Sequence, residues 1–182
     1  MHRLLSVDPT RCDKTSACPV FSACGQEGRV PCLDMRTAHQ TKLRLCERLE
    51  NIADRLPVVD RLLCLQIASE LVPVLRDCHR YEEEVVLPAF QRGSTDRNSS
   101  NASIRRLLVE HVEDECAAQD LSDLLLSIGH GGDVDNPEAL GFMMRAFFHS
   151  MRRHIAFEHE HILPFTAAML DDDACRETRA GS

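Results

Sequence analysis

The sequence has no tryptophan, a single tyrosine and only 4% aromatic residues. It also has no apolar run approaching the ~20 residues that cross a bilayer, and its first residues lead into Asp8-Pro9 rather than into the apolar segment of a secretory signal. Neither a membrane span nor secretion is therefore expected. We predict a cytoplasmic protein whose core is built mainly from leucine and other aliphatic side chains.

Blocks of basic residues are also missing. The chain carries 21 basic and 29 acidic residues, a net charge of -8. Because nucleic acids and anionic membranes attract clustered positive charge, neither is expected as the main partner. With 182 residues and 43% hydrophobic content, the chain can bury one good core. We predict one domain, residues 36–170, between an N-terminal tail, residues 1–35, and a frayed C-terminal tail, residues 171–182.

The nine cysteines do not show the C-x-x-C spacing of structural zinc sites. Four lie in the predicted tail, among prolines and glycines: Cys12, Cys18, Cys24 and Cys32. This tail is predicted to be loop-like or disordered, with an accessory metal or redox role as the alternative. Four others lie inside predicted helices and favour reduced thiols over disulfides: Cys46, Cys64, Cys78 and Cys116.

Two long segments repeat the pattern His-x-x-x-Glu. At 3.6 residues per turn, His154 and Glu158 continue the apolar stripe of one segment, and His79 and Glu83 continue that of the other. An ionised glutamate on an apolar face costs several kcal/mol unless a partner neutralises it. Since a histidine one turn away is a natural co-ligand, the pattern indicates metal binding.

Two further segments each place one histidine on the inward stripe, His39 in one and His111 in the other. A single histidine on an apolar face is more often a core residue than a ligand. Four inward histidines together with two carboxylates at i+4 spacing favour a metal site.

The periodic segments predict an all-α fold of four helices, separated by Pro57 and by loops at residues 92–101 and 129–135. The expected bounds are Met35–Leu56, Val58–Phe90 with a bend at Pro73, Ala102–Ile128 and Pro137–His161. In an antiparallel arrangement the four histidines lie at matching heights near the loop at 92–101. We therefore predict an up-down-up-down four-helix bundle with a metal site in its core.

Four imidazoles and at least two glutamates inside a bundle suit a two-metal site, because a carboxylate from each of two helices can bridge neighbouring cations. Imidazole suits iron, copper and zinc, whereas added carboxylates favour iron or manganese, so iron is the expected metal. The alternative is a metal-free bundle with neutral, hydrogen-bonded histidines. That alternative would leave Glu83 and Glu158 without partners.

These residues resemble the hemerythrin-like cation-binding domains, whose signature is His, His-x-x-x-Glu, His, His-x-x-x-Glu. Over about residues 36–168 the matching positions are His39, His79, Glu83, His111, His154 and Glu158. The resemblance implies a non-haem di-iron centre in a four-helix bundle, with two iron ions linked by an oxo or hydroxo group and bridged by the two motif carboxylates. Manganese or zinc is the less favoured metal.

One position departs from the oxygen carriers of that family, in which the third helix supplies a His-x-x-x-His pair. Here Glu115 stands four residues after His111 on the same stripe. Glu115 is either a further metal ligand or a carboxylate at the rim that lies next to the ligands without binding the metal. An anionic ligand stabilises Fe(III) and would weaken reversible oxygen carriage. The neighbouring acidic residues are expected to form a solvated rim: Glu82, Glu84, Glu110, Glu113 and Asp114.

Three functions share this predicted centre. The first is a di-iron protein that senses or binds oxygen or a related diatomic or peroxide ligand. The second is an enzyme that acts on peroxide or nitric oxide, or that donates iron for repair of iron centres. The third is a metal-stabilised scaffold for a protein partner, which the sequence does not identify. Because all three keep the same ligands, the sequence separates them poorly.

Overall fold

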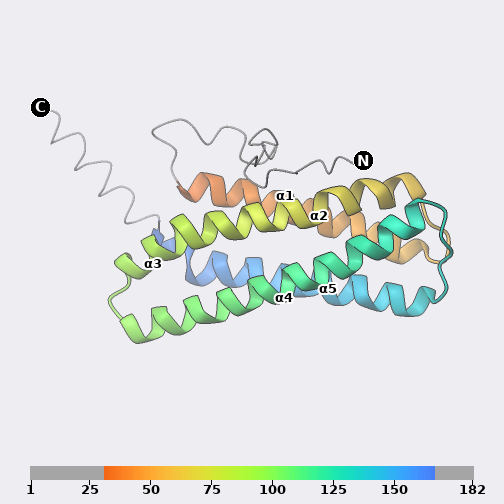
Figure 1. The fold of residues 1–182 in the computed structure, drawn as a ribbon. Coiled ribbons are helices and arrows are strands. Elements are labelled where there is room, and N and C mark those ends of the chain that lie inside the picture. Colours follow the sequence, from red (N-terminus) through yellow and green to blue (C-terminus); the bar gives the residue numbers. More distant parts are fainter. Residues whose placement is uncertain (1–30, 167–182) are drawn as a thin grey trace, which may run out of the picture.

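The structure is a computed structural model that describes residues 31–166, and every regular element in this range is a helix. Four long helices lie along one another (Figure 1): α1 (Pro31–Arg55), α2 (Arg61–Tyr81), α4 (Arg97–Gly129) and α5 (Pro137–His161). A π-helix, η1 (Glu82–Val86), and a short helix, α3 (Leu87–Gly93), continue α2. The all-α prediction is confirmed for these residues. The predictions for residues 1–30, which include Cys12, Cys18 and Cys24, and for the C-terminal tail lie outside the described residues. Cys32, which was expected in the loop-like tail, lies in α1.

Three of the helices begin at a capping side chain, and these caps set their bounds. Asp60, Asp96 and Asn136 each accept a hydrogen bond from a backbone N–H in the first turn of α2, α4 and α5. The predicted start of α4 at Ala102 was too late, because Asp96 caps a helix that begins at Arg97. The predicted bounds of α5 are confirmed, since Asn136 precedes a proline at the first helical position.

The connections place the helices relative to the site. In Figure 1 the α1–α2 and α4–α5 connections lie at one end of the molecule, and the α3–α4 connection lies at the other. Helix α2 packs most extensively against α4, and α1 packs against α5. No helix within residues 31–166 combines the length and the apolar character that a membrane span requires.

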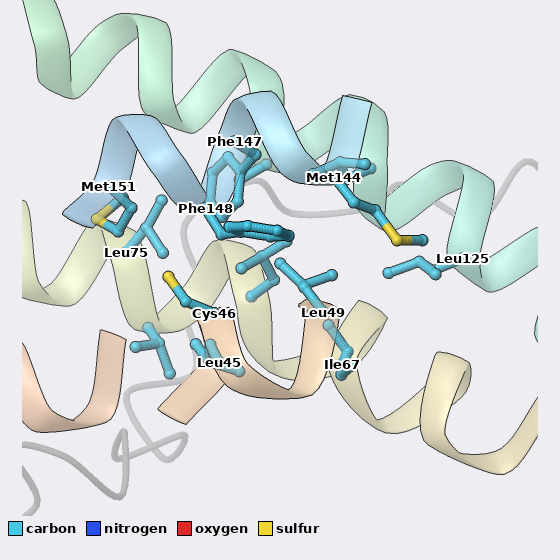
Figure 2. Close-up of a cluster of buried hydrophobic side chains, with 14 of the residues drawn as sticks. Leu45, Cys46, Leu49, Ile67, Leu75, Leu125, Met144, Phe147, Phe148 and Met151 are labelled. Carbon is cyan, nitrogen blue, oxygen red and sulfur yellow. The ribbon is translucent and has the colours of Figure 1, made fainter. Parts of the chain in front are cut away.

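Two apolar clusters hold the helices together. The larger draws on all four long helices, and Figure 2 shows Phe148 of α5 near Cys46 and Leu49 of α1. The smaller one lies towards the α3–α4 connection: Met35, Val86, Leu87, Phe90, Leu107, Ile162 and Leu163. Buried polar residues lie between members of the two clusters along α2 and η1, along α4 and along α5, and α1 adds the buried His39 and Lys42. This arrangement makes a polar layer inside an otherwise apolar core.

Candidate metal centre

The polar layer contains eight buried titratable side chains: His39, Lys42, His79, Glu82, His111, Asp114, His154 and Glu158. Helix α1 contributes two of them, and the α2–η1 segment, α4 and α5 contribute two each. Burying so many polar groups is unfavourable unless they are paired with one another or with a bound ion. The contacts of these side chains therefore indicate whether the layer can bind an ion.

Four of these side chains converge tightly. One ligand atom from each of Glu82, His111, His154 and Glu158 lies within 4.8 Å of all the others. The Nε2 atom of His111 is 3.1 Å from Oε2 of Glu82, and Nε2 of His154 is 3.5 Å from Oε2 of Glu158. Two imidazoles and two carboxylates from three separate helical segments thus face one point in the core.

The hydrogen bonding of this group fits a metal cation. Within residues 31–166, Nε2 of His154 and Oε1 of Glu158 have no hydrogen-bond partner, and Nε2 of His111 and Oε2 of Glu82 have only each other, at 3.1 Å. Leaving a buried polar atom unpaired costs about 1–3 kcal/mol, and more for a charged one. A cation bound by these atoms would remove that cost, and zinc, iron and manganese all accept imidazole and carboxylate ligands.

Glu82 lies three residues after His79, at the first position of the π-helix. In η1 the N–H of Leu87 donates to the carbonyl of Glu82, five residues back, so this turn is wider than an α-helical turn. The side chain of Glu82 is fully buried, whereas that of Glu83 is 43% exposed. The prediction of a solvated rim is wrong for Glu82, because its i+3 spacing from His79 places it on the same inward face of the helix.

Asp114 was also assigned to the solvated rim, and the structure places it in the core. It lies one turn after His111 at i+3 spacing, so it shares the inward face of α4. Its Oδ2 atom is 3.6 Å from Nδ1 of His154. Asp114 is therefore a neighbour of the four-residue group, and the rim prediction is wrong for it as well.

The other four predicted ligands surround the group of four. The Nε2 atom of His39 is 2.8 Å from Oε2 of Glu158, and the ring of His79 stacks on that of His111 with centroids 4.1 Å apart. Glu83 is hydrogen-bonded to Nδ1 of His111 at 2.7 Å. Glu115, with 29% of its side chain exposed, is hydrogen-bonded to Nδ1 of His79 at 3.0 Å. Their assignment as ligands stays a prediction.

Lys42 is a member of the polar layer that the motif spacing did not predict. Its Nζ atom donates to Oε1 of Glu82 at 2.8 Å and lies 3.9 Å from Oε2 of Glu158. The chain has 19 arginines but only two lysines, Lys14 and Lys42. A lysine three residues after His39, on the inward face of α1, was the available signal.

A family model matches residues 33–166, and its description is the hemerythrin HHE cation-binding domain. The chain belongs to this family. The resemblance found in the motif residues is thereby confirmed, and with it a helical domain that binds metal cations. No curated protein and no solved structure gave a match.

Neighbouring charges inside this HHE domain shift the pKa values of Lys42 and Glu158. Burial alone would lower the pKa of Lys42, but the carboxylates of Glu82 and Glu158 outweigh it and raise that pKa above its ordinary value. Burial alone would raise the pKa of Glu158, but Lys42, His154 and His39 hold it well below its ordinary value. Both groups are therefore charged near neutral pH.

The pKa values of His79 and His111 are shifted in opposite directions. Burial, with Lys42 and the neighbouring imidazoles, lowers the pKa of His79, so this ring is neutral at physiological pH. Burial also opposes protonation of His111, but Glu82 and Glu83 outweigh it and raise the pKa of that ring. A metal cation at the four-residue group would compete with the proton on His111, because a metal ligand must be deprotonated.

Two open pockets reach the polar layer of the HHE domain. One, of about 440 Å³, is lined by Arg76, Glu83, His111, Val112, Glu115, Cys116 and Gln119. The other, of about 400 Å³, lies between α4 and α5 and is lined in part by Asp114. The first pocket gives a small molecule a path from the surface to an imidazole of the group.

Proposed function

We propose that this HHE domain binds iron in its core and uses it to bind or sense oxygen or a related diatomic or peroxide ligand. The observation that carries the proposal is the convergence of four buried ligand atoms from Glu82, His111, His154 and Glu158 within 4.8 Å. The positions of the connections in Figure 1 support an up-down-up-down bundle around this point. Bound iron would supply redox chemistry and affinity for small ligands.

The residues of the chain have distinct parts in this proposal. His111 and His154 supply nitrogen ligands, and Glu82 and Glu158 supply the negative charge that a multivalent cation requires. Lys42 and His39 each hold one oxygen of a glutamate, so the free oxygens are oriented before a cation binds. In the same way, Glu83 fixes the orientation of the His111 ring through Nδ1.

The route from the surface to the centre is suited to a small ligand. The pocket of about 440 Å³ ends at His111, and the apolar clusters cover the polar layer along the axis of the bundle. Glu115 lines this pocket and contacts Arg76 and His79. We propose that Glu115 acts at the entrance and through His79 rather than as a ligand.

Metal analysis combined with a visible spectrum tests this function. We expect the aerobically purified protein to contain iron, to absorb visible light in the ferric state, to bleach with dithionite and to recover in air. Turnover of peroxide or nitric oxide above free-iron controls would favour an enzyme instead. A colourless, metal-free and fully folded protein would contradict metal binding and leave the scaffold function.

The cytoplasmic location and the absence of a nucleic-acid partner remain predictions from the composition. The number of iron ions also remains open, because the resemblance implies two, whereas the four converging atoms define one position. The surroundings of Lys42 bear directly on that number.

A further inference from the structure

Lys42 and His39 each occupy one oxygen of a buried carboxylate of the centre, Lys42 that of Glu82 and His39 that of Glu158. Oε1 of Glu82 accepts a hydrogen bond from Lys42 at 2.8 Å, and Oε2 of Glu158 bonds to His39 at 2.8 Å and lies 3.9 Å from Lys42. The other oxygen of Glu158 has no hydrogen-bond partner among residues 31–166, and the other oxygen of Glu82 lies 3.1 Å from Nε2 of His111, a ligand atom of the same group. Each carboxylate thus keeps one oxygen for an external cation.

A carboxylate that bridges two metal ions in the bidentate mode binds one ion with each of its oxygens. In this core the second oxygen faces a fixed positive charge of the protein itself. A second metal ion at that place would have to displace the Lys42 ammonium from Glu82 and would be repelled by it at short range. The pair of ions implied by the family resemblance therefore conflicts with the contacts of Lys42.

We propose that Lys42 takes the place of a second cation, so that the centre binds one metal ion, at Glu82, His111, His154 and Glu158. This inference rests on the metal binding proposed above and adds the number of ions. Nitrogen donors for a second ion are present, because Nδ1 of His39 and Nε2 of His79 are buried without hydrogen-bond partners among the described residues. The positive charge and the occupied oxygens exclude that ion.

A lysine at position 42 is suited to take the place of a second cation. The chain uses arginine at 19 of its 21 basic positions, yet the fully buried cation is a lysine. An ammonium is a compact point charge, comparable to a metal ion in how it faces a single carboxylate oxygen, whereas a guanidinium is a wide planar fork.

Native mass spectrometry after loading with Zn(II) and gel filtration tests the number directly, with Cys12, Cys18, Cys24 and Cys32 changed to serine in every protein compared so that these thiols add no Zn(II) to the count. We expect one Zn(II) per chain in the wild type and two in Lys42→Met, which keeps a side chain of similar length without the charge. Arg48→Met is the matched control, because Arg48 is a cation on the same helix that pairs with the exposed Glu70. This control should bind one Zn(II).

Three results distinguish a failure of the one-ion proposal from a failure of metal binding itself. Two Zn(II) ions in the wild type would overturn the inference and leave metal binding intact. One Zn(II) in a folded Lys42→Met variant would also overturn it, since Lys42 would not then set the number. A wild type that binds no Zn(II) and no Fe(II) would instead contradict the proposed metal site itself.

A measurement on the native lysine covers the case in which Lys42→Met does not fold. Lysine-selective ¹⁵N labelling of Lys14→Arg leaves Lys42 as the only lysine in the chain. We expect a slowly exchanging ammonium resonance that persists when Zn(II) is bound, because the pair with Glu82 remains. Loss of that resonance on saturation with Zn(II) would show that metal displaces Lys42 and would overturn the inference.

Discussion

Glu82 and Glu83 are neighbours in the sequence, but only Glu82 has a fully buried side chain that faces the other ligand atoms. Glu83 is 43% exposed and reaches the centre only through Nδ1 of His111. The two residues therefore test whether the buried position or the His-x-x-x-Glu spacing identifies the ligand.

The first prediction compares Glu82→Gln with Glu83→Gln. Loss of a contact that only orients a ligand costs on the order of 10–100-fold in metal affinity, so loss of a charged ligand should cost more. We expect the affinity for Zn(II) or Fe(II) to fall by more than about 100-fold in Glu82→Gln, and by about tenfold in Glu83→Gln. Competition with a chelator of known affinity measures both values, and the reverse order would restore Glu83 as the ligand.

The second prediction concerns Cys46, which is fully buried and has its pKa raised by burial to about 12 from an ordinary value of 9.0. The protonated thiol therefore favours the folded state below pH 9.0, and this contribution is lost as the pH rises through about 12. At pH 9.0 we expect iodoacetamide to modify the exposed Cys116 and to leave Cys46 intact.

Peptide mass spectrometry reads the extent of modification at each cysteine. The same reaction in guanidinium chloride should modify both thiols, which serves as the control. Equal rates at Cys46 and Cys116 in the folded protein would contradict a sealed core around α1.

At the scale of single elements, α5 could be predicted from the sequence and η1 could not. His154 and Glu158 lie in a regular α-helix, so their i+4 spacing predicted their common inward face. Glu82, Glu83 and Glu84 have identical side chains, so no difference in polarity shows which of them faces the core. Without such a difference, the extra residue of a π turn leaves no trace in an apolar period.

The third prediction concerns the contact between α2 and the end of α4. A Cβ atom at Gly129 would lie 2.5 Å from Cδ2 of Leu65 and 3.2 Å from the carbonyl oxygen of Arg61. Helix propensity alone would favour alanine here by up to about 1 kcal/mol, but overpacking of this kind typically costs about 1–3 kcal/mol. We expect Gly129→Ala to lower the free energy of unfolding by about 1–2 kcal/mol in urea titrations.

Asp120→Ala, at an exposed position of the same helix, is the control and should change the free energy of unfolding by less than about 0.5 kcal/mol. A Gly129→Ala variant more stable than the wild type would mean that Leu65 moves aside without cost. Helix packing at this end would then be looser than the structure shows.

For the whole molecule, the helical fold was easier to predict than the metal site. The helices follow from local sequence patterns, whereas the site depends on contacts between distant parts of the chain. Four periodic segments were sufficient to predict the helices, because each helix buries one periodic, mainly apolar face. The ligand group depends on contacts between residues far apart in the sequence, such as Lys42 with Glu82 and His39 with Glu158. Such pairings are set by tertiary packing and leave no spacing pattern in the chain.

The fourth prediction is that removal of metal destabilises the folded protein. Binding to the folded state alone contributes about 2.7 kcal/mol when the free metal is about 100 times Kd. For a domain of this size that corresponds to a Tm decrease on the order of 5–15 °C after chelation. Calorimetry of the metal-loaded and chelated protein measures it, and Glu82→Gln should show a much smaller difference. Identical melting curves after verified removal of metal would contradict a buried site.

The central claim is that one cation is held in the core by the imidazoles of His111 and His154 and by the carboxylates of Glu82 and Glu158. X-ray absorption spectroscopy of the iron-loaded protein tests it most directly, because imidazole rings and neighbouring metal ions give distinct scattering. The account predicts two imidazoles per iron and no iron–iron scattering. Four or more imidazoles shared by two neighbouring iron ions would contradict it.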